Sequence, residues 1–274
     1  MNPAYDPLTY LIEVAHGEGI AVHPWFIVAR NPGGSALPDS YAAGAPPGSF
    51  NVHNAEFRSF IVALVTDVAR RYAIDGVNLD YIRAIGPCSS EECLAAYGKA
   101  YGRSLTQDWK AQEAGQVVPS VIEWNRTAIT DIVSRISSGV RRLKPNAVLS
   151  IDTVPFDHSR QHQGLDEERW LRAGLIDDLF DMSYEDPIDI STLDHAMTAF
   201  TPARQVVVVR DYDVFGGAVV DRSGAVMGDY VRLIRTRWPG AGVAFYHYPH
   251  LSSEQVLRLG EDVFKQAANP VWTH

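Results

Sequence analysis

The chain has 274 residues, of which 46% are hydrophobic, 21% charged and 10% aromatic, a composition typical of a globular protein with a large buried core. The formal net charge of −9 argues against a protein that binds nucleic acid through phosphate contacts. No apolar run approaches the roughly 18 residues of a membrane span, and the first residues, MNPAYDPL, lack the regions of a signal peptide.

Short apolar runs alternate along the chain with longer segments of helical period, which predicts a parallel sheet with crossover helices. Six strands are expected, at 19–27, 76–82, 147–154, 179–185, 205–212 and 242–248. Apolar residues at helical spacing predict one helix over 57–72, capped by Asn54, and another over 122–140. Ser252 and Gln255 have the spacing of a capping box before a last helix. Shorter helices are expected near 4–17, 166–175, 190–199 and 228–237.

Three insertions follow predicted strands, so in an open α/β sheet or a barrel they lie at the carboxyl end, where sites are built. Segments 28–53 and 84–119 exceed the usual length of a strand-to-helix loop, and FGGAVVDRSGAVMGD is expected to form a hairpin that turns at Arg222 to Gly224. The second segment contains Cys88 and Cys93, which fit a small disulfide loop or two free thiols equally well. No linker divides the chain, and residues 1–274 are expected to form a single domain.

Polar side chains share one face of several predicted strands. Val77, Leu79 and Tyr81 form the apolar parity of GVNLDYI, which places Asn78 and Asp80 on the inner face. The same alternation turns the following residues inward: Ala21, His23, Trp25, Ser150, Asp152, Asp181, Ser183 and Glu185. Buried carboxylates are costly unless they are paired or hydrogen-bonded, so several acids at one end of a sheet suggest acid and base chemistry. The structural alternative is that Asp80 pairs with Arg83 while the other acids cap helices or contact water.

Several stretches resemble the glycosyl-hydrolase-like family 10, bacterial TIM-barrel enzymes that include a peptidoglycan glycan-strand hydrolase. The stretches are YDPLTYLIEVAHGEGIAVHPWF, DGVNLDYIR, YGKAYGRSL with EWNRTAITDIVSRISSGVRRLKPNAVLSI, and WLRAGLIDDLFDMSYE. The resemblance implies a TIM-type (β/α) barrel. The barrel is expected to be incomplete here, because only six strands are recognisable and the family's first two strands have no counterpart among them. It also implies that Asp80 and Arg83 occupy the family's strand-end Asp and Arg. Two departures are the RAIGP sequence after Asp80-Tyr-Ile and the charged Asp152 where the family often has an uncharged residue.

The resemblance further implies export to the periplasm or the extracellular space. An open barrel edge would favour self-association, or cover by a missing N-terminal segment.

These observations lead us to expect a glycoside hydrolase that acts on a poly- or oligosaccharide, such as a bacterial cell-wall or exopolysaccharide glycan, by carboxylate chemistry. Asp80 is expected to act as nucleophile or base and Glu185 as general acid, with Asp152 and Asp211 as the alternatives. The expected substrate-binding residues stack on sugar faces or hydrogen-bond hydroxyls: His23, Trp25, Asn78, Arg83, Tyr212, Tyr246 and His247. Tyr184 ranks lowest among the aromatic candidates because its parity turns it toward the helices.

Two alternatives remain open at this point. One is a barrel that binds glycans without cleaving them, or an inactive fragment. The other is a metal-dependent hydrolase that uses His23, His247, His250 and Asp211 as ligands. Against the second, the first strand offers VHP and no His-x-His pair. No motif for a cofactor follows a strand, so no cofactor or resident metal is expected.

Overall fold

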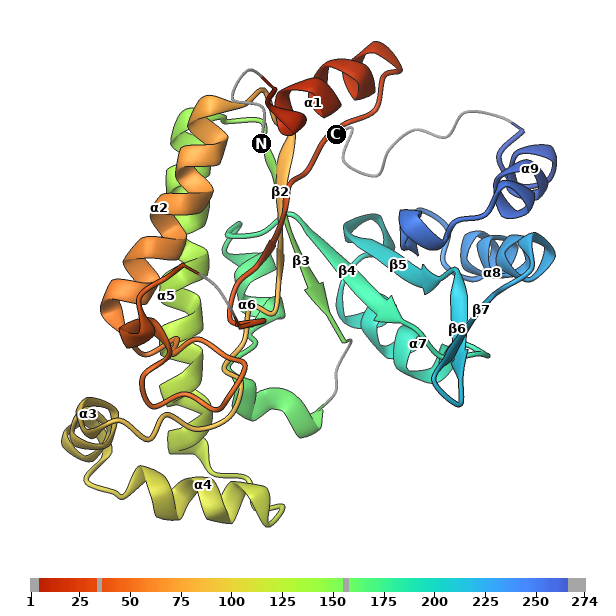
Figure 1. The fold of residues 1–274 in the computed structure, drawn as a ribbon. Helices are drawn as coiled ribbons and strands as arrows, with labels where there is room; N and C mark the ends of the chain where they lie inside the picture. The colour runs from red at the N-terminus through yellow and green to blue at the C-terminus, as the bar shows by residue number, and fades with distance from the viewer. Residues whose placement is uncertain (1–4, 34–35, 155–157, 266–274) are drawn as a thin grey trace. The chain divides into compact units, whose positions relative to one another are not determined.

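The computed structural model describes residues 5–33, 36–154 and 158–265, which form two compact units (Figure 1). The first unit comprises Met1–Ile151 and Asp157–Asp177, and the second comprises Asp152–Phe156 and Asp178–His274. Each unit contains three strands of parallel sheet that alternate with helices. The six predicted strands and the α/β class are thereby confirmed, whereas the single-domain organisation stays a prediction.

The first unit is built around β2, whose two neighbours run parallel to it. Trp25 of β1 lies opposite Asn78 of β2, and Asn78 lies opposite Ser150 of β3. The elements are α1 (Pro7–Gly17), β1 (Trp25–Ile27), a 3-10 turn (Asp39–Ala42), α2 (Ala55–Arg71), β2 (Gly76–Asp80), α3 (Glu91–Tyr101), α4 (Leu105–Glu113), α5 (Pro119–Leu143), β3 (Val148–Thr153), a 3-10 turn (His158–Gln163) and α6 (Glu167–Arg172).

Strand β1 is shorter than the expected run of 19–27. Pro24 precedes Trp25 and has no N–H group, so it cannot donate to a ladder. The extended backbone before it still pairs with the next strand, because the carbonyls of Val22 and Pro24 accept hydrogen bonds from Asp75 and Asn78.

Helices α2 and α5 run side by side in Figure 1. The side chain of Asn54 caps α2 as expected, accepting from the N–H groups of Glu56 and Phe57 at 2.8 and 3.0 Å. A Cβ at Gly139 of α5 would lie 2.3 Å from Thr66 Cγ2 of α2, so the absence of a side chain lets the two helices approach. The buried apolar stripes on these helices follow the expected helical spacing.

The segment 84–119, expected as a long loop, contains two helices and a disulfide. Cys88 and Cys93 are bonded, and both side chains are buried with Tyr97 and Trp109 in a small core of their own. The spacing of Cys93, Tyr97 and Tyr101 is helical, but the residues between them are mostly small or apolar, so one face of the helix does not stand out in the sequence. The disulfide decides between the two alternatives that the cysteines left open.

The second unit is built around β5, which pairs in parallel with β4 on one side and β8 on the other. Its elements are β4 (Asp178–Ser183), α7 (Ile190–Ala199), a 3-10 turn (Pro202–Arg204), β5 (Gln205–Arg210), β6 (Tyr212–Phe215), β7 (Ala218–Asp221), α8 (Gly224–Arg237), β8 (Gly242–Tyr246), a 3-10 turn (Tyr248–His250) and α9 (Ser253–Glu261). The expected capping box of Ser252 and Gln255 opens α9. Within the described ranges no helix has the length and apolar character to cross a membrane.

The hairpin of this unit turns at a different place from the expected one. Strands β6 and β7 pair antiparallel around Gly216 and Gly217, which have φ of 57° and 86°. Two successive positive φ angles are typical of a type I′ turn, for which glycine is favoured. The predicted turn at Arg222 to Gly224 is wrong, because Ser223 caps α8 by accepting from the Val226 N–H.

Candidate active site

In the first unit, the carboxyl end of β2 carries the polar face that the alternation of GVNLDYI predicts. Val77 and Leu79 are fully buried apolar residues. On the other parity, the side-chain amide of Asn78 donates a hydrogen bond to the Ser150 hydroxyl at 3.1 Å. Asn78 and Ser150 therefore occupy one face of neighbouring strands, and Asp80, two residues further along β2, shares the parity of Asn78.

The carboxyl group of Asp80 is buried at the end of this face. Burial raises its pKa, although three interactions act in the opposite direction: the Tyr81 N–H, the Arg83 charge and a hydrogen bond from Trp25. The Tyr81 N–H donates to Asp80 Oδ1 at 2.6 Å. A carboxylate that stays more basic than usual, yet is held in position by donors, is suited to act as a base or a nucleophile.

Two aromatic residues flank Asp80. Trp25 is 50% exposed, so part of the residue is accessible to solvent although it donates a hydrogen bond to the Asp80 carboxyl. Tyr81 has φ of +50°, a left-handed conformation that is unusual for a bulky residue and recurs at functional sites. The guanidinium groups of Arg83 and Arg30 lie 4.5 and 5.8 Å from the centre of its ring.

His23 lies away from this strand end. A Cβ added to Gly76, the first residue of β2, would come within 2.6 Å of the His23 ring, so the imidazole packs at the amino end of the strand. Burial there lowers the pKa of His23, against the influence of Asp75. Asp80 is at the carboxyl end of the same strand, so we leave His23 out of the proposed site.

In the second unit, Glu185 follows the end of β4 and is exposed. The residues on either side of it are anchored. The carbonyl of Tyr184 accepts from Arg222 Nη2 at 3.1 Å, and the Asp186 carboxylate accepts a hydrogen bond from the Tyr230 hydroxyl.

Asp211, directly after β5, is fully buried. Its Oδ1 accepts from the backbone N–H of His247 at 2.9 Å, and its Oδ2 is buried without a hydrogen-bond partner among the described residues. Burial raises the pKa of this carboxyl group. Its backbone carbonyl accepts from Gln255 at 2.7 Å, so Asp211 joins β5 to β8 and α9. Asp152, the other alternative, is partly exposed near the carboxyl end of β3.

Aromatic rings gather at the carboxyl ends of the strands of this unit. The Tyr184 and Tyr246 rings stack with centroids 5.4 Å apart, and His247 lies 4.4 Å from Tyr246. Tyr212 lies 4.5 Å from His250. The Arg210 guanidinium lies 4.7 Å from the Tyr184 ring and 5.2 Å from the Tyr212 ring. Flat, partly exposed rings at strand ends can stack on sugar faces.

Sequence reasoning undervalued Tyr184, which follows the last residue of β4, where the strand alternation no longer applies. It also passed over Arg210 and Arg222. Arg210 follows the apolar run VVVV and could have been found from its place at the strand end, but nothing in VDRSG marks Arg222 as a buried residue.

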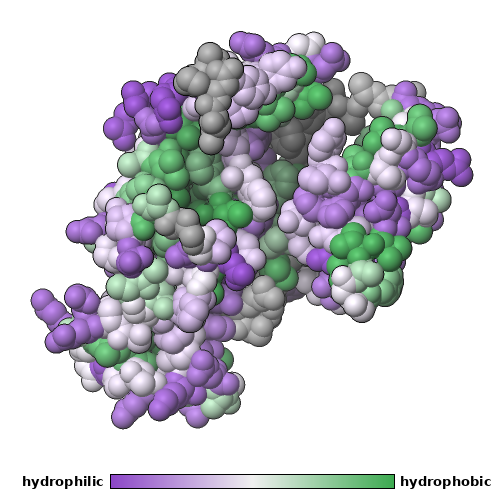
Figure 2. All heavy atoms as spheres, in the orientation of Figure 1, coloured by the Kyte–Doolittle hydropathy of each residue, from purple (hydrophilic) through white to green (hydrophobic). Residues whose placement is uncertain are grey.

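The hairpin β6–β7 adds exposed apolar surface to the same end of the second unit. Val214, Phe215, Val219 and Val220 are exposed, and Figure 2 shows a hydrophobic cluster over the hairpin. The hairpin follows β5 directly, so this surface adjoins the strand ends that carry the rings.

A family model described as glycosyl hydrolase-like 10 matches residues 39–219. The chain belongs to this family. The resemblance seen in the sequence is confirmed, and the matched range includes Asp80, Arg83, Asp152, Glu185 and Asp211. Trp25, Tyr246 and His247 lie outside it.

Relatives of this glycosyl hydrolase-like 10 chain include two named glycosyl hydrolases. DigH of Escherichia coli K12 is 23% identical over 213 residues, which cover 64% of this chain and 45% of DigH. YngK of Bacillus subtilis is 25% identical over 194 residues, which cover 64% of this chain and 38% of YngK. The chain thus spans less than half the length of these relatives.

Among solved structures, the PgaB (BpsB) glycoside hydrolase domain from Bordetella bronchiseptica has a TM-score of 0.68, with 14% identity, over 95% of this chain and 80% of that chain. The likeness shows a shared fold with a TIM-barrel glycoside hydrolase.

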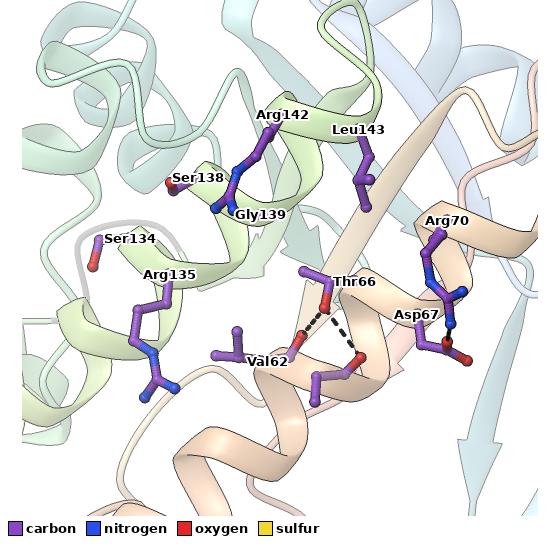
Figure 3. A pocket seen from close by; sticks show the side chains of 11 residues that line it. Val62, Thr66, Asp67, Arg70, Ser134, Arg135, Ser138, Gly139, Arg142 and Leu143 are labelled. Atoms are coloured by element: carbon purple, nitrogen blue, oxygen red, sulfur yellow. Dashed lines mark hydrogen bonds and ion pairs between the residues drawn. The ribbon is translucent and has the colours of Figure 1, made fainter.

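A separate groove of about 630 Å³ lies between α2 and α5 in the glycosyl hydrolase-like 10 chain (Figure 3). Its walls carry Arg70, Arg135 and Arg142. Among the described residues that line it, Asp67 is the one carboxylate, and Arg70 and Arg71 neutralise it. A groove without a second acid does not fit the two-carboxylate chemistry of glycoside hydrolysis.

The structure gives no support to the metal-dependent hydrolase alternative in the part of the chain that it describes. Over the described ranges, no three His, Cys, Asp or Glu side chains gather in a way that could hold an ion. His23 belongs to the first unit, whereas His247, His250 and Asp211 belong to the second.

Proposed function

We propose that the chain is a glycoside hydrolase that cleaves the O-glycosidic bonds of a bacterial cell-wall or exopolysaccharide glycan. The observation that carries the proposal is the buried, basic carboxyl of Asp80 at the carboxyl end of a parallel strand, in a chain of the glycosyl hydrolase-like 10 family. Carboxyl ends of such strands are where (β/α) enzymes place their chemistry.

In the proposed reaction, a protonated Glu185 donates its proton to the glycosidic oxygen as the bond to the anomeric carbon breaks. The Asp80 carboxylate either attacks that carbon or removes a proton from the attacking water, and the net change is the addition of one water. Glu185 is exposed in the free protein, so its carboxyl group is accessible to a substrate.

The alternative acids are less suited. Asp211 is fully buried and its carboxyl group accepts from the backbone N–H of His247, so it is less accessible to a glycosidic oxygen than the exposed Glu185. Asp152 remains the second choice, since it is partly exposed near the end of β3.

Binding would use the exposed rings and the polar groups at the strand ends. In the first unit Trp25 would offer a surface for a sugar. In the second unit the stacked pair of Tyr184 and Tyr246 would do so, with His247 beside Tyr246 and Tyr212 beside His247. Arg83 and Asn78 would donate to hydroxyls near Asp80. The Cys88–Cys93 disulfide supports export, because disulfides persist in oxidising compartments. Association through the edge of β1 stays a proposal.

The test is the release of new reducing ends from purified bacterial glycans. The wild type should produce them, whereas Asp80→Asn and Glu185→Gln should not while remaining folded. A glycan-binding barrel without catalysis, which the exposed rings also suit, would bind the same glycans and release nothing in any variant.

A further inference from the structure

Arg222, the residue after β7, is buried although it is charged; its side chain is only 1% exposed. Its guanidinium bonds to one carboxylate, as Nε and Nη2 donate to Asp213 Oδ1 at 2.9 and 2.6 Å. A buried charge that is paired in this way is compensated, whereas loss of either partner would leave the other uncompensated.

The remaining donors of Arg222 bind backbone carbonyls where two strands end. Nη1 donates to the carbonyl of Arg210 at 3.2 Å, at the end of β5, and Nη2 donates to the carbonyl of Tyr184 at 3.1 Å, just past β4. These four bonds leave from three nitrogens of one planar group, whereas the ammonium of lysine has three donors on a single nitrogen and cannot reproduce them.

The backbone of Arg222 is fixed as well. Its N–H donates to the Asp211 carbonyl at 2.9 Å, and its carbonyl accepts from Gln255 Nε2 at 2.6 Å. Gln255 is fully buried and also donates to the Asp211 carbonyl. The side chain of Arg222 therefore extends from a rigid support toward the segment after β4.

A second anchor holds that segment from α8. The Tyr230 hydroxyl donates to the Asp186 carboxylate, and its buried ring lies 5.8 Å from the Arg222 guanidinium. Burial and the bond to Asp186 raise the pKa of Tyr230 to about 12, so its hydroxyl remains a donor at any working pH.

We propose that Arg222 and Tyr230 are positioning residues that hold Glu185 in place from either side, through Tyr184 and Asp186. The inference rests on the proposed role of Glu185 as general acid. Glu185 is exposed between two anchored neighbours, so the backbone that carries it is fixed while its carboxyl stays accessible to a substrate. Neither Arg222 nor Tyr230 touches the substrate in this account.

The test compares two substrates that differ in their need for an acid. One is the bacterial glycan that the wild type cleaves, and the other is the 2,4-dinitrophenyl glycoside of the fragment that it releases. A dinitrophenolate leaves without protonation. Loss or misplacement of a general acid therefore lowers kcat/KM, which reports cleavage of the glycosidic bond, on the glycan and spares it on the aryl glycoside.

We expect Arg222→Lys and Tyr230→Phe to lower kcat/KM on the glycan about 10- to 100-fold, with KM within about twofold. On the aryl glycoside we expect changes in kcat/KM below about threefold. Tyr230→Phe removes a single hydroxyl and keeps the proposal testable if Arg222→Lys does not fold, as judged by circular dichroism. The matched controls are Arg237→Lys, at an exposed residue of α8 that pairs with Asp194 of α7, and Tyr248→Phe, at a residue that is 86% exposed.

The outcomes separate this inference from the proposed function. A parallel loss on both substrates, or no loss on either, would overturn the positioning roles, provided that Glu185→Gln spares the aryl glycoside. If Glu185→Gln itself lowers kcat/KM equally on both substrates, Glu185 is not the acid and the proposed assignment fails first.

Discussion

The backbone N–H of Tyr81 donates to the Asp80 carboxyl over 2.6 Å, although the two residues are adjacent in the chain. Tyr81 also has a left-handed backbone, with φ of +50°, which changes the direction of the chain directly after this carboxyl group. Asp80 is thus held by its own neighbour at the end of β2, and burial still leaves its pKa raised.

The first prediction is that Asp80→Asn will keep or increase the free energy of unfolding at neutral pH. A carboxyl whose folded pKa is raised is harder to ionise in the folded protein than in the unfolded chain, so its charge destabilises the fold above that pKa. Asparagine removes the charge and still accepts from the Tyr81 N–H. Urea unfolding at pH 7 measures the effect, and a clear loss of stability would contradict the account. Asn78→Ala is a comparison variant that should lose stability with its bond to Ser150.

The second prediction concerns Asp108 of α4. It is buried and accepts from the Tyr97 hydroxyl at 2.6 Å, from Arg103 at 2.6 and 2.7 Å, and from Ser120 at 3.0 Å. We expect Asp108→Asn to cost about 2 kcal/mol of unfolding free energy, since it removes the charge that these donors bind. Denaturant unfolding at pH 7 checks this value, and Asp131→Asn serves as a partly exposed control. A loss no larger than that of the control would show that the network contributes little.

The third prediction is a dependence of stability on pH that arises from His53. Burial lowers its pKa from 6.5 to about 4, while the bond to Asn125 Oδ1 at 2.8 Å acts against the shift and the Arg58 charge adds to it. In the unfolded chain His53 therefore binds a proton below pH 6.5, whereas in the folded protein it does not bind one until about pH 4.

The stability that neutral His53 contributes is fully present above pH 6.5. It is lost as the pH falls from 6.5 to 4, and the total loss of unfolding free energy is about 3 kcal/mol. Unfolding measured at half-unit steps should show a steeper decline for the wild type than for His53→Gln. Parallel curves for the two proteins would mean that His53 titrates normally.

The fourth prediction concerns the disulfide. Cys88 and Cys93 are five residues apart, and a loop this short is expected to contribute about 2 kcal/mol by restricting the unfolded chain. Reduction should therefore lower the melting temperature of the wild type and leave that of the Cys88→Ser/Cys93→Ser double variant unchanged. If reduction has no effect on the wild type, the bond does not constrain the unfolded chain as described.

Local patterns in the sequence predicted most of the strands and helices. Strand β2 was evident because Val77 and Leu79 alternate with polar residues, and the cap of α2 was evident because Asn54 stands at its start. These features depend on residues close together in the chain, which a single sequence displays directly.

The features that sequence reasoning missed depend on contacts between distant residues. The buried position of Arg222 follows from Tyr184 and Arg210, which lie 38 and 12 residues earlier in the chain. The hairpin turn was misplaced although the residues involved are close together in the chain. Gly216-Gly217 has the residues of a type I′ turn, but RSG also resembles a turn. Only the cap of α8 at Ser223 decides between the two positions. The position of His23 at the amino end of β2 depends on its packing against Gly76.

The most direct measurement is the count of new reducing ends released from bacterial cell-wall and exopolysaccharide glycans by the wild type, Asp80→Asn and Glu185→Gln. We expect release by the wild type, a loss of about 1,000-fold or more in Asp80→Asn at an unchanged or higher melting temperature, and a comparable loss in Glu185→Gln. Equal release by the wild type and Asp80→Asn, or none from any glycan by the folded wild type, would contradict hydrolysis by these two carboxyl groups.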